Sequence, residues 1–170
     1  MDLKKLIRDI PNFPMEGIIF KDITTLLKDN NGFEETLTKL VNLSKNKGIT
    51  KVVAIESRGF IFGGALAHKL NAGFVPIRKP GKLPAEKLQE EYTLEYGTDK
   101  IEIHTDALNE NDVVLIHDDL LATGGTMVAA CKLVEKTGAR IEQISFIIEL
   151  DFLNGREHLE NYNVEALIHY

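Results

Sequence analysis

Apolar residues fall into short runs and helical stripes that alternate along the chain from residue 51 onwards. Runs rich in β-branched residues predict strands at 51–55, 74–77, 113–116, within 141–150 and at 164–168. Stripes with helical spacing predict helices over 59–70 and over the segment that carries Met127, Ala130, Cys131 and Val134. Strands that are apolar throughout and alternate with helices are typical of a parallel sheet covered on both faces. We therefore predict an α/β fold with a parallel, Rossmann-like sheet flanked by helices.

The remaining segments follow other patterns. A short N-terminal helix, stopped by Pro11, is predicted by the helical spacing of Leu3, Leu6, Ile7 and Ile10. We interpret 11–22, with two prolines and Gly17, as irregular. A second helix, ending near Gly48, is predicted by Phe33, Leu37, Leu40 and Val41. The polar stretch 78–108 predicts a mobile loop followed by a hairpin built from the alternating runs 92–96 and 101–103.

Length, composition and charge narrow the class of protein. The 170 residues suit one domain, 1–170, and 44% of them are hydrophobic. No apolar run approaches the roughly 18 residues of a membrane span, and the N-terminus lacks the apolar region of a signal peptide. The one cysteine, Cys131, cannot form an internal disulfide, which favours the cytoplasm. A net charge of −6 argues against a nucleic-acid partner but permits a locally positive pocket.

The clearest candidate for chemistry is the segment that follows the strand 113–116. Asp118 and Asp119 come first, and Ala122-Thr123-Gly124-Gly125-Thr126 then opens a helix. A turn with two glycines leaves backbone N–H groups free to converge on an anion, and the helix N-terminus adds further donors. Two adjacent carboxylates accept hydrogen bonds from hydroxyls, or bind a divalent cation. This order suits a ligand with a phosphate at one end and a vicinal diol at the other.

Two other phosphate-binding motifs do not fit this sequence. A P-loop requires Gly-Lys-Ser/Thr, and no lysine follows Gly125. A dinucleotide fingerprint requires G-x-G-x-x-G, and Gly59, Gly63 and Gly64 have the wrong spacing. A solvated turn with an acidic cap remains the structural alternative for 118–126, but it does not explain why two carboxylates stand side by side after a buried strand.

The motif HDDLLATGGT at 117–126 resembles the phosphoribosyl-diphosphate motif of type I phosphoribosyltransferases. Further segments resemble the adenine-specific branch of that family, and together they cover nearly the whole chain. They are IPNFPMEGIIFKDIT near the start, ESRGFIFGGALA at 56–67, IRKPGKLP at 77–84, EEYTLEYGTDKIEIHTDAL at 90–108 and IIELDFLNGREHL at 147–159.

The resemblance implies a fold, a reaction and an assembly. The family has a parallel-sheet core, a small hood and a flexible loop, and the hood here would come from roughly 1–30 and 78–108. The reaction implied is the transfer of the sugar phosphate of 5-phosphoribosyl 1-diphosphate to adenine, with Mg²⁺, giving AMP and diphosphate in purine salvage. The resemblance also implies a homodimer.

The resemblance assigns roles to residues that contact phosphoribosyl diphosphate. Asp118 and Asp119 would accept hydrogen bonds from the ribose hydroxyls. The same two residues could also contact the Mg²⁺ that the diphosphate binds. The 5-phosphate would be held by Ala122, Thr123, Gly124, Gly125 and Thr126. The diphosphate would lie near Arg58 and the cations Arg78, Lys79 and Lys82, with Arg78 acting across a dimer interface. Surface charges are the plainer interpretation of these four cations, and Glu56 would orient the turn before Arg58.

Glu95 is the candidate catalytic residue, in the hood hairpin. The reaction should pass through an oxocarbenium-like state, by analogy with glycoside chemistry. A carboxylate near the sugar could stabilise that charge or take a proton from the base. An exposed strand glutamate is the structural alternative.

The adenine site implied by the resemblance uses Ile19, Phe20, Lys21 and Leu120. Phe20 and Leu120 would lie on the two faces of the purine, and backbone groups of Ile19 and Lys21 would contact its edge. A backbone carbonyl accepts from the amine of adenine and rejects oxo-purines. Lys21 stands where relatives often carry arginine, so a planar two-bond contact is lost. Phe20 as a core residue is the alternative.

Two other functions stay open at this point. One is a regulatory protein that uses the pocket to sense phosphoribosyl diphosphate, and the other is a phosphoribosyltransferase for hypoxanthine, guanine or xanthine. Net acidity argues against the first, because such relatives bind RNA or DNA.

Overall fold

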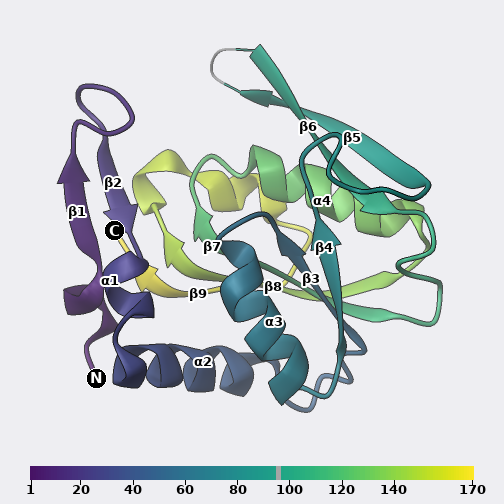
Figure 1. Ribbon diagram of the computed structural model, residues 1–170, viewed down its shortest axis with the longest axis horizontal. Helices are drawn as coiled ribbons and strands as arrows, with labels where there is room; N and C mark the ends of the chain where they lie inside the picture. Colours follow the sequence, from purple (N-terminus) through teal and green to yellow (C-terminus); the bar gives the residue numbers. More distant parts are fainter. Residues whose placement is uncertain (95–96) are drawn as a thin grey trace. The chain divides into compact units, whose positions relative to one another are not determined.

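The computed structural model describes residues 1–94 and 97–170 (Figure 1). The chain forms two compact units, Met1–Lys39 and Leu40–Tyr170, and each is described by itself. In the part of the chain that the structure describes, no helix is long and apolar enough to cross a membrane.

The second unit is built on a five-stranded sheet whose order is β4-β3-β7-β8-β9 (Figure 1). All four strand pairings are parallel, which confirms the predicted fold class. The strands are β3 (Lys51–Ile55), β4 (Gly73–Ile77), β7 (Val113–Leu121), β8 (Arg140–Glu149) and β9 (Val164–His169). Helix α3 (Gly59–Lys69) connects β3 to β4, and α4 (Gly125–Lys136) connects β7 to β8.

The two helices cover opposite faces of the sheet. Val53, Ile116 and Phe146 point to one face, where they share a buried cluster with Ala130 and Leu133 of α4. Ala54 points to the other face, because side chains alternate along a strand. There α3 approaches so closely that a Cβ on Gly63 would lie 2.5 Å from the Ala54 Cβ. Strands buried on both sides explain the continuous apolar runs in the sequence.

Two short structures complete this unit near the ends of the strands. Strands β5 (Lys87–Leu94) and β6 (Gly97–His104) form the predicted antiparallel hairpin, and both are longer than the runs that indicated them. The hairpin is joined to the segment after β4 because Arg78 and Glu102 exchange two backbone hydrogen bonds. Between β8 and β9 lie the 3-10 helices η2 (Asp151–Leu153) and η3 (Gly155–Leu159).

The first unit differs from the prediction at its start. The 3-10 helix η1 ends at Leu6, and Ile10 lies in strand β1 (Arg8–Pro11), which pairs with β2 (Ile19–Asp22). The turn between them is possible because Asn12 and Gly17 adopt positive φ angles of 56° and 87°. The predicted N-terminal helix is therefore present only as a 3-10 helix over Leu3–Leu6, and the irregular segment only over 12–18, since long-range strand pairing outweighed local spacing elsewhere.

Helices follow this hairpin in the first unit. A short helix, α1 (Thr24–Leu27), precedes α2 (Asn30–Ser44), which runs on into the second unit. The second helix expected from the sequence is thus present, and it ends four residues before Gly48. Asp22 fixes the start of α1: an amide hydrogen bond from Thr24, with the Thr24 hydroxyl and Arg8, lowers the pKa of Asp22 to about 2.

Strand β8, which pairs with β7 on one edge and β9 on the other, should contribute strongly to the stability of the second unit. Replacing Phe146, which is 1% exposed, by alanine leaves a cavity in the cluster and should lower the free energy of unfolding by about 3–5 kcal/mol. The matched control is Phe152→Ala at a side chain that is 68% exposed, expected to cost less than about 1 kcal/mol. Denaturant titration measures both, and equal losses would contradict this assignment of the core.

Candidate active site

The order of the sheet creates a crevice between β3 and β7. From β3 the chain crosses over α3 to β4 on one side, and from β7 it crosses over α4 to β8 on the other. At such a switch point the loops that follow the two strands diverge, which leaves space outside the carboxyl ends. The loop after β3 begins with Glu56, Ser57 and Arg58, whereas β7 carries the two acids near its end and is followed by the glycine turn. The sequence motifs at 56–59 and 118–126 therefore meet at this edge.

Asp118 and Asp119 lie within β7, which continues to Leu121 rather than ending at the predicted Ile116. The longer strand arises because β8 pairs with β7 as far as Leu121, opposite Glu149. Consecutive strand residues start toward opposite faces, but the two carboxyl groups still lie close enough to interact with each other. Asp119 is buried and forms an ion pair with Arg58 (Nε to Oδ2, 2.8 Å). The Asp118 carboxylate accepts from the Asp119 amide at 2.9 Å.

Both carboxyl groups are electrostatically destabilised in their ionised form. Burial raises the pKa of Asp118 well above its ordinary value, and the neighbouring charge of Asp119 raises it further. Burial also raises the pKa of Asp119, although Arg58 opposes that change. An isolated buried charge is costly, so these groups favour a ligand that donates hydrogen bonds or carries positive charge.

The turn after β7 presents a row of unpaired amide groups. Helix α4 starts at Gly125, and its first backbone bond runs from the Val128 amide to the Gly124 carbonyl at 3.0 Å. For the amides of 123–127, no acceptor lies within the described residues. Gly124 makes the turn in the left-handed region, with φ of 87°. Free amides at the positive end of a helix form an anion site.

Two adjoining hollows connect these groups. One, of about 170 Å³, is lined by Ile55, Glu56, Ser57, Arg58, Lys79, Tyr92, Asp118, Asp119, Leu120 and Thr126. The other, of about 180 Å³, is lined by Asp118 and Leu120–Met127. Asp118, Leu120 and Thr126 border both. The structure thus brings together most of the residues predicted to contact phosphoribosyl diphosphate.

The cations after β4 are anchored by acidic partners. Glu56 accepts from Arg78 Nε at 2.9 Å and from the Lys79 amide at 2.8 Å, so it orders the segment after β4. The Lys79 ammonium contacts the Asp99 carboxylate and the Tyr92 hydroxyl of the hairpin. Burial opposes its charge, but these hydrogen bonds raise the pKa of Lys79 overall. Lys79 therefore brings a fixed positive charge to the 170 Å³ hollow.

Several predicted residues are not part of these hollows. Arg78 lines neither hollow, and its guanidinium lies 5.9 Å from the Phe60 ring centre. Lys82 is exposed and also lines neither. Ile19, Phe20 and Lys21 belong to the first unit, where Lys21 pairs with Asp9 at 2.7 Å. Glu95 lies outside the described residues.

His117 has a structural role. Its side chain is fully buried, and Nδ1 lies 2.9 Å from the Ser145 hydroxyl of β8. Burial lowers the pKa of His117 to about 4, so the ring is neutral at physiological pH.

The sequence interpretation missed residues whose importance lies in close approach. A Cβ on Gly59 would lie 2.9 Å from Asp118 Oδ1, and a Cβ on Gly155 would lie 2.2 Å from the Ala122 carbonyl oxygen. Gly59 follows a strand and opens a helix, which is a usable signal. Gly155 had no local signal, because it is distant in sequence from the turn it contacts.

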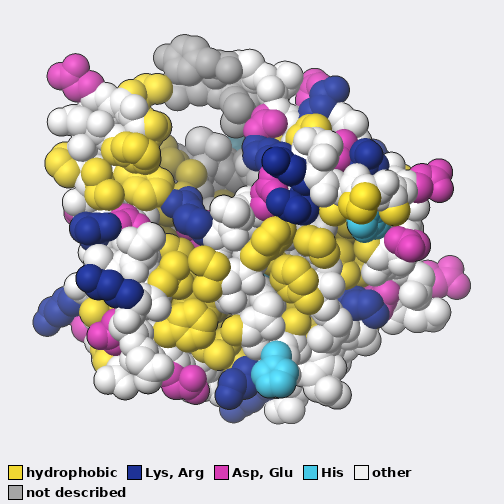
Figure 2. Space-filling view, in the orientation of Figure 1, with side chains coloured by type: hydrophobic (Ala, Val, Ile, Leu, Met, Phe, Trp, Pro, Cys, Tyr) yellow, Lys and Arg dark blue, Asp and Glu magenta, His cyan; other side chains and the backbone are white. Residues whose placement is uncertain are grey.

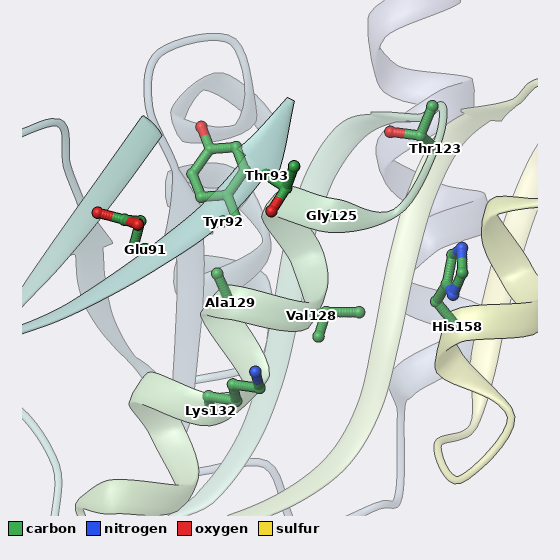
Figure 3. A pocket seen from close by; sticks show the side chains of 9 residues that line it. All are labelled: Glu91, Tyr92, Thr93, Thr123, Gly125, Val128, Ala129, Lys132 and His158. Carbon is green, nitrogen blue, oxygen red and sulfur yellow. The ribbon is translucent and has the colours of Figure 1, made fainter. Parts of the chain in front are cut away.

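A third hollow, of about 440 Å³, lies on the outer side of the turn, between β5, α4 and η3 (Figure 3). It contains neither aspartate but shares Thr123 and Gly125 with the turn. Its other lining residues are Glu91, Tyr92, Thr93, Val128, Ala129, Lys132 and His158.

Comparison with known proteins agrees with this geometry. Residues 23–167 match the family model described as a phosphoribosyl transferase domain. The chain is 60% identical over 159 residues to an adenine phosphoribosyltransferase of Bacteroides fragilis, covering 94% of this chain and 89% of that protein. A crystal structure of the Thermoanaerobacter pseudethanolicus enzyme superposes with a TM-score of 0.97 at 51% identity, covering 99% and 98% of the two chains.

A crystal structure of the Giardia lamblia enzyme, complexed with 9-deazaadenine, has a TM-score of 0.94 at 40% identity and covers 99% of this chain and 96% of that one. Identity this high over nearly full length exceeds what a shared fold alone requires. The chain therefore belongs to the phosphoribosyltransferase family, and within it to the adenine phosphoribosyltransferases.

Proposed function

We propose that this protein joins adenine to 5-phosphoribosyl 1-diphosphate and releases AMP and diphosphate, in purine salvage. The observation that carries this proposal is the placement of paired carboxylates and unpaired amides around adjoining hollows at one sheet edge. Membership in the adenine branch supports adenine as the base.

The sugar phosphate spans the two hollows. Asp118 and Asp119 accept hydrogen bonds from the ribose 2- and 3-hydroxyls, which relieves the cost of their burial. The amides of 123–127, with the hydroxyls of Thr123 and Thr126, bind the 5-phosphate. Since Asp118 and Thr126 border both hollows, one ligand can reach both sets of groups.

The reaction breaks the bond between C1 of the ribose and the diphosphate oxygen and forms a bond from C1 to N9 of adenine. Diphosphate leaves as an anion, and Arg58 and Lys79 supply positive charge beside it. Arg78 and Lys82 are proposed to join them from the segment after β4. The proton of N9 must go to a base, and Glu95 is proposed for that role or for stabilising the positive charge on the sugar.

Mg²⁺ is the proposed cofactor, bound mainly by the diphosphate. The donor chemistry fits, because Asp118 and Asp119 are hard oxygen ligands whose burial favours a cation. Asp118 and Asp119 are the residues that would contact it, and its charge would stabilise the leaving diphosphate.

Adenine is proposed to bind against Leu120, which borders both hollows. Ile19, Phe20 and Lys21 would complete the base site, with Phe20 stacking on the purine. The related Giardia lamblia enzyme, crystallised with an adenine analogue, supports this choice of base. We also propose that 1–30 and 78–108 serve as the hood of a single functional domain, and that the protein is cytoplasmic.

A homodimer is the proposed assembly, formed through α3 and the edge strand β4. Ile61 and Phe74 are 42% and 39% exposed, so α3 and β4 each present a large apolar side chain at the surface. Phe60 packs edge-on against Phe74 with ring centres 5.6 Å apart. Figure 2 shows hydrophobic side chains gathered over α3 and β4. Arg78 lies against Phe60, so a partner on this face would lie close to Arg78.

The activity depends on the carboxylate pair. The purified protein should convert adenine, but not hypoxanthine, to its nucleotide, as measured by chromatography of the products. The double variant Asp118→Ala, Asp119→Ala loses two charge-assisted hydrogen bonds, so kcat/KM for phosphoribosyl diphosphate should fall at least ~100-fold. Normal turnover by this variant would refute the site. Faster turnover of hypoxanthine than adenine would refute the choice of base.

The carboxylate pair should also lower the free energy of unfolding at neutral pH. The folded state holds the Asp118 proton more tightly than the unfolded chain does, because its pKa is raised. The free energy of unfolding therefore falls as pH rises from the ordinary aspartate pKa through the folded one. Asp118→Asn removes this loss of stability, so at pH 7 the Tm of the variant should exceed that of the parent by a few degrees. In a protein of this size, a stabilisation of ~1 kcal/mol raises Tm by about 2–4 °C. At pH 3 the difference should vanish. A lower Tm at pH 7 would contradict the electrostatic account.

A single charged substitution tests the proposed dimer interface. Phe74→Asp places a carboxylate in the proposed interface and should give a monomer in sedimentation velocity, whereas the parent is a dimer. Phe152→Asp, at another exposed phenylalanine, is the control that should remain dimeric. A monomeric parent, or a dimeric Phe74→Asp variant, would exclude this interface.

A further inference from the structure

The turn between η2 and η3 presses against the turn at 122–124. A Cβ on Gly155 would lie 2.2 Å from the Ala122 carbonyl oxygen and 3.1 Å from the Gly124 nitrogen. In return, a Cβ on Gly124 would lie 2.7 Å from the Gly155 carbonyl oxygen. The two backbones thus touch with no side chain between them, and neither can shift toward the other. Since Gly124 belongs to the row of unpaired amides at 123–127, Gly155 limits where those amides point.

Arg156 fixes the position of Gly155. Its guanidinium donates to Glu149 through Nε at 2.9 Å and through a second, shorter bond, and its third nitrogen donates to the Val164 carbonyl at 2.7 Å. Glu149 ends β8 directly opposite Leu121 of β7. Arg156 therefore ties η3 to the last residue of β8 and the first residue of β9. Planar two-bond pairing of this kind holds orientation as well as distance.

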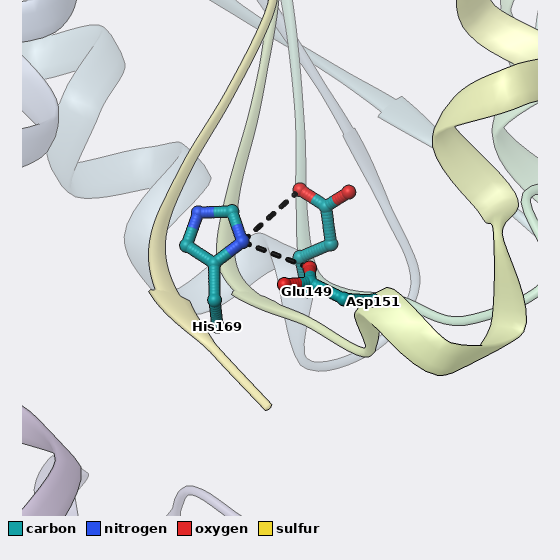
Figure 4. Close-up of side chains that lie close together, drawn as sticks. All are labelled: Glu149, Asp151 and His169. Atoms are coloured by element: carbon teal, nitrogen blue, oxygen red, sulfur yellow. Dashed lines mark hydrogen bonds and ion pairs between the residues drawn. The ribbon is translucent and has the colours of Figure 1, made fainter.

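The surroundings of Glu149 strengthen this anchor. Figure 4 shows the His169 ring directed at the carboxylates of Glu149 and Asp151, with Nδ1 at 3.8 Å and 2.9 Å from them. These three side chains could hold a metal ion by proximity alone. However, both oxygens of Glu149 already accept from Arg156, whose charge disfavours a cation. The cluster is therefore better explained as part of the anchor than as a metal site.

We infer that Arg156, paired with Glu149, is a positioning residue for the 5-phosphate site and acts through the contact of Gly155 with Ala122 and Gly124. This inference rests on the proposed role of 122–126 in binding the phosphate. Arg156 lines neither hollow, so it does not bind the phosphate itself. Its effect is to keep the amides convergent before the ligand arrives.

The test separates the two ends of the substrate. The main variant is the double exchange Glu149→Gln, Arg156→Gln, which removes the pair without leaving a buried charge. Its affinity for AMP, which carries the 5-phosphate, should fall at least ~10-fold by calorimetry, because a small misplacement of binding groups is costly. Its affinity for magnesium diphosphate should stay within about twofold, since that ligand does not reach the turn. KM for phosphoribosyl diphosphate should rise accordingly, with KM for adenine unchanged. Arg156→Lys should give an intermediate loss.

Three further variants make the outcome decisive. Arg140→Gln breaks another ion pair of β8, with Glu142 at the opposite end of the strand, and should change neither affinity. Gly155→Ala should reproduce the selective loss of AMP binding through steric contact alone. Thr126→Ala tests the phosphate site itself. If Thr126→Ala weakens AMP binding but the folded Arg156 and Gly155 variants do not, the inference is wrong while the proposed function stands. Equal losses for AMP and diphosphate would likewise overturn it, and an unaffected Thr126→Ala would overturn both.

Discussion

The candidate site depends on backbone amides that the fold leaves without acceptors. At the end of β7 the chain must turn into α4, and the amides of 123–127 donate to nothing in the described part of the protein. Unpaired amides are unfavourable once they are shielded from water, so a protein keeps such a row only where something else satisfies it. Gly124 allows the turn by its positive φ, and the contact with Gly155 restricts its position. The proposed phosphate site is therefore a property of the backbone.

Charge is arranged around that row in a consistent order. The carboxylates of the half-buried Asp118 and the buried Asp119 come before the turn, where they would repel a phosphate but can accept hydrogen bonds from hydroxyls. Arg58 and Lys79 line the 170 Å³ hollow, where negative charge would develop on the leaving diphosphate. The acidic partners Glu56 and Asp99 hold the segment that carries Lys79. Because this segment is already ordered, substrate binding costs less conformational entropy. A net acidic protein thus has a local site suited to a polyanion.

The sequence predicted the parallel sheet well because its strands are buried on both faces. Such strands are apolar throughout, and runs such as 51–55 show this directly in the sequence. It also predicted that Asp118 to Thr126 lie at the end of a strand and the start of a helix, since strand, acids and glycines are contiguous there. It failed at Ile10, where pairing with Phe20 decided the structure and no local pattern records a partner. It missed Gly155 for the same reason, because contact with Ala122 is visible only after folding. Local structure was therefore predictable, and contacts between distant segments were not.

The most direct measurement of the central claim is a crystal structure of the protein with ribose 5-phosphate. The account predicts phosphate oxygens within hydrogen-bond distance of the amides of 123–127, and ribose hydroxyls on the carboxylates of Asp118 and Asp119. A sugar phosphate bound elsewhere, with those amides facing only solvent, would contradict it.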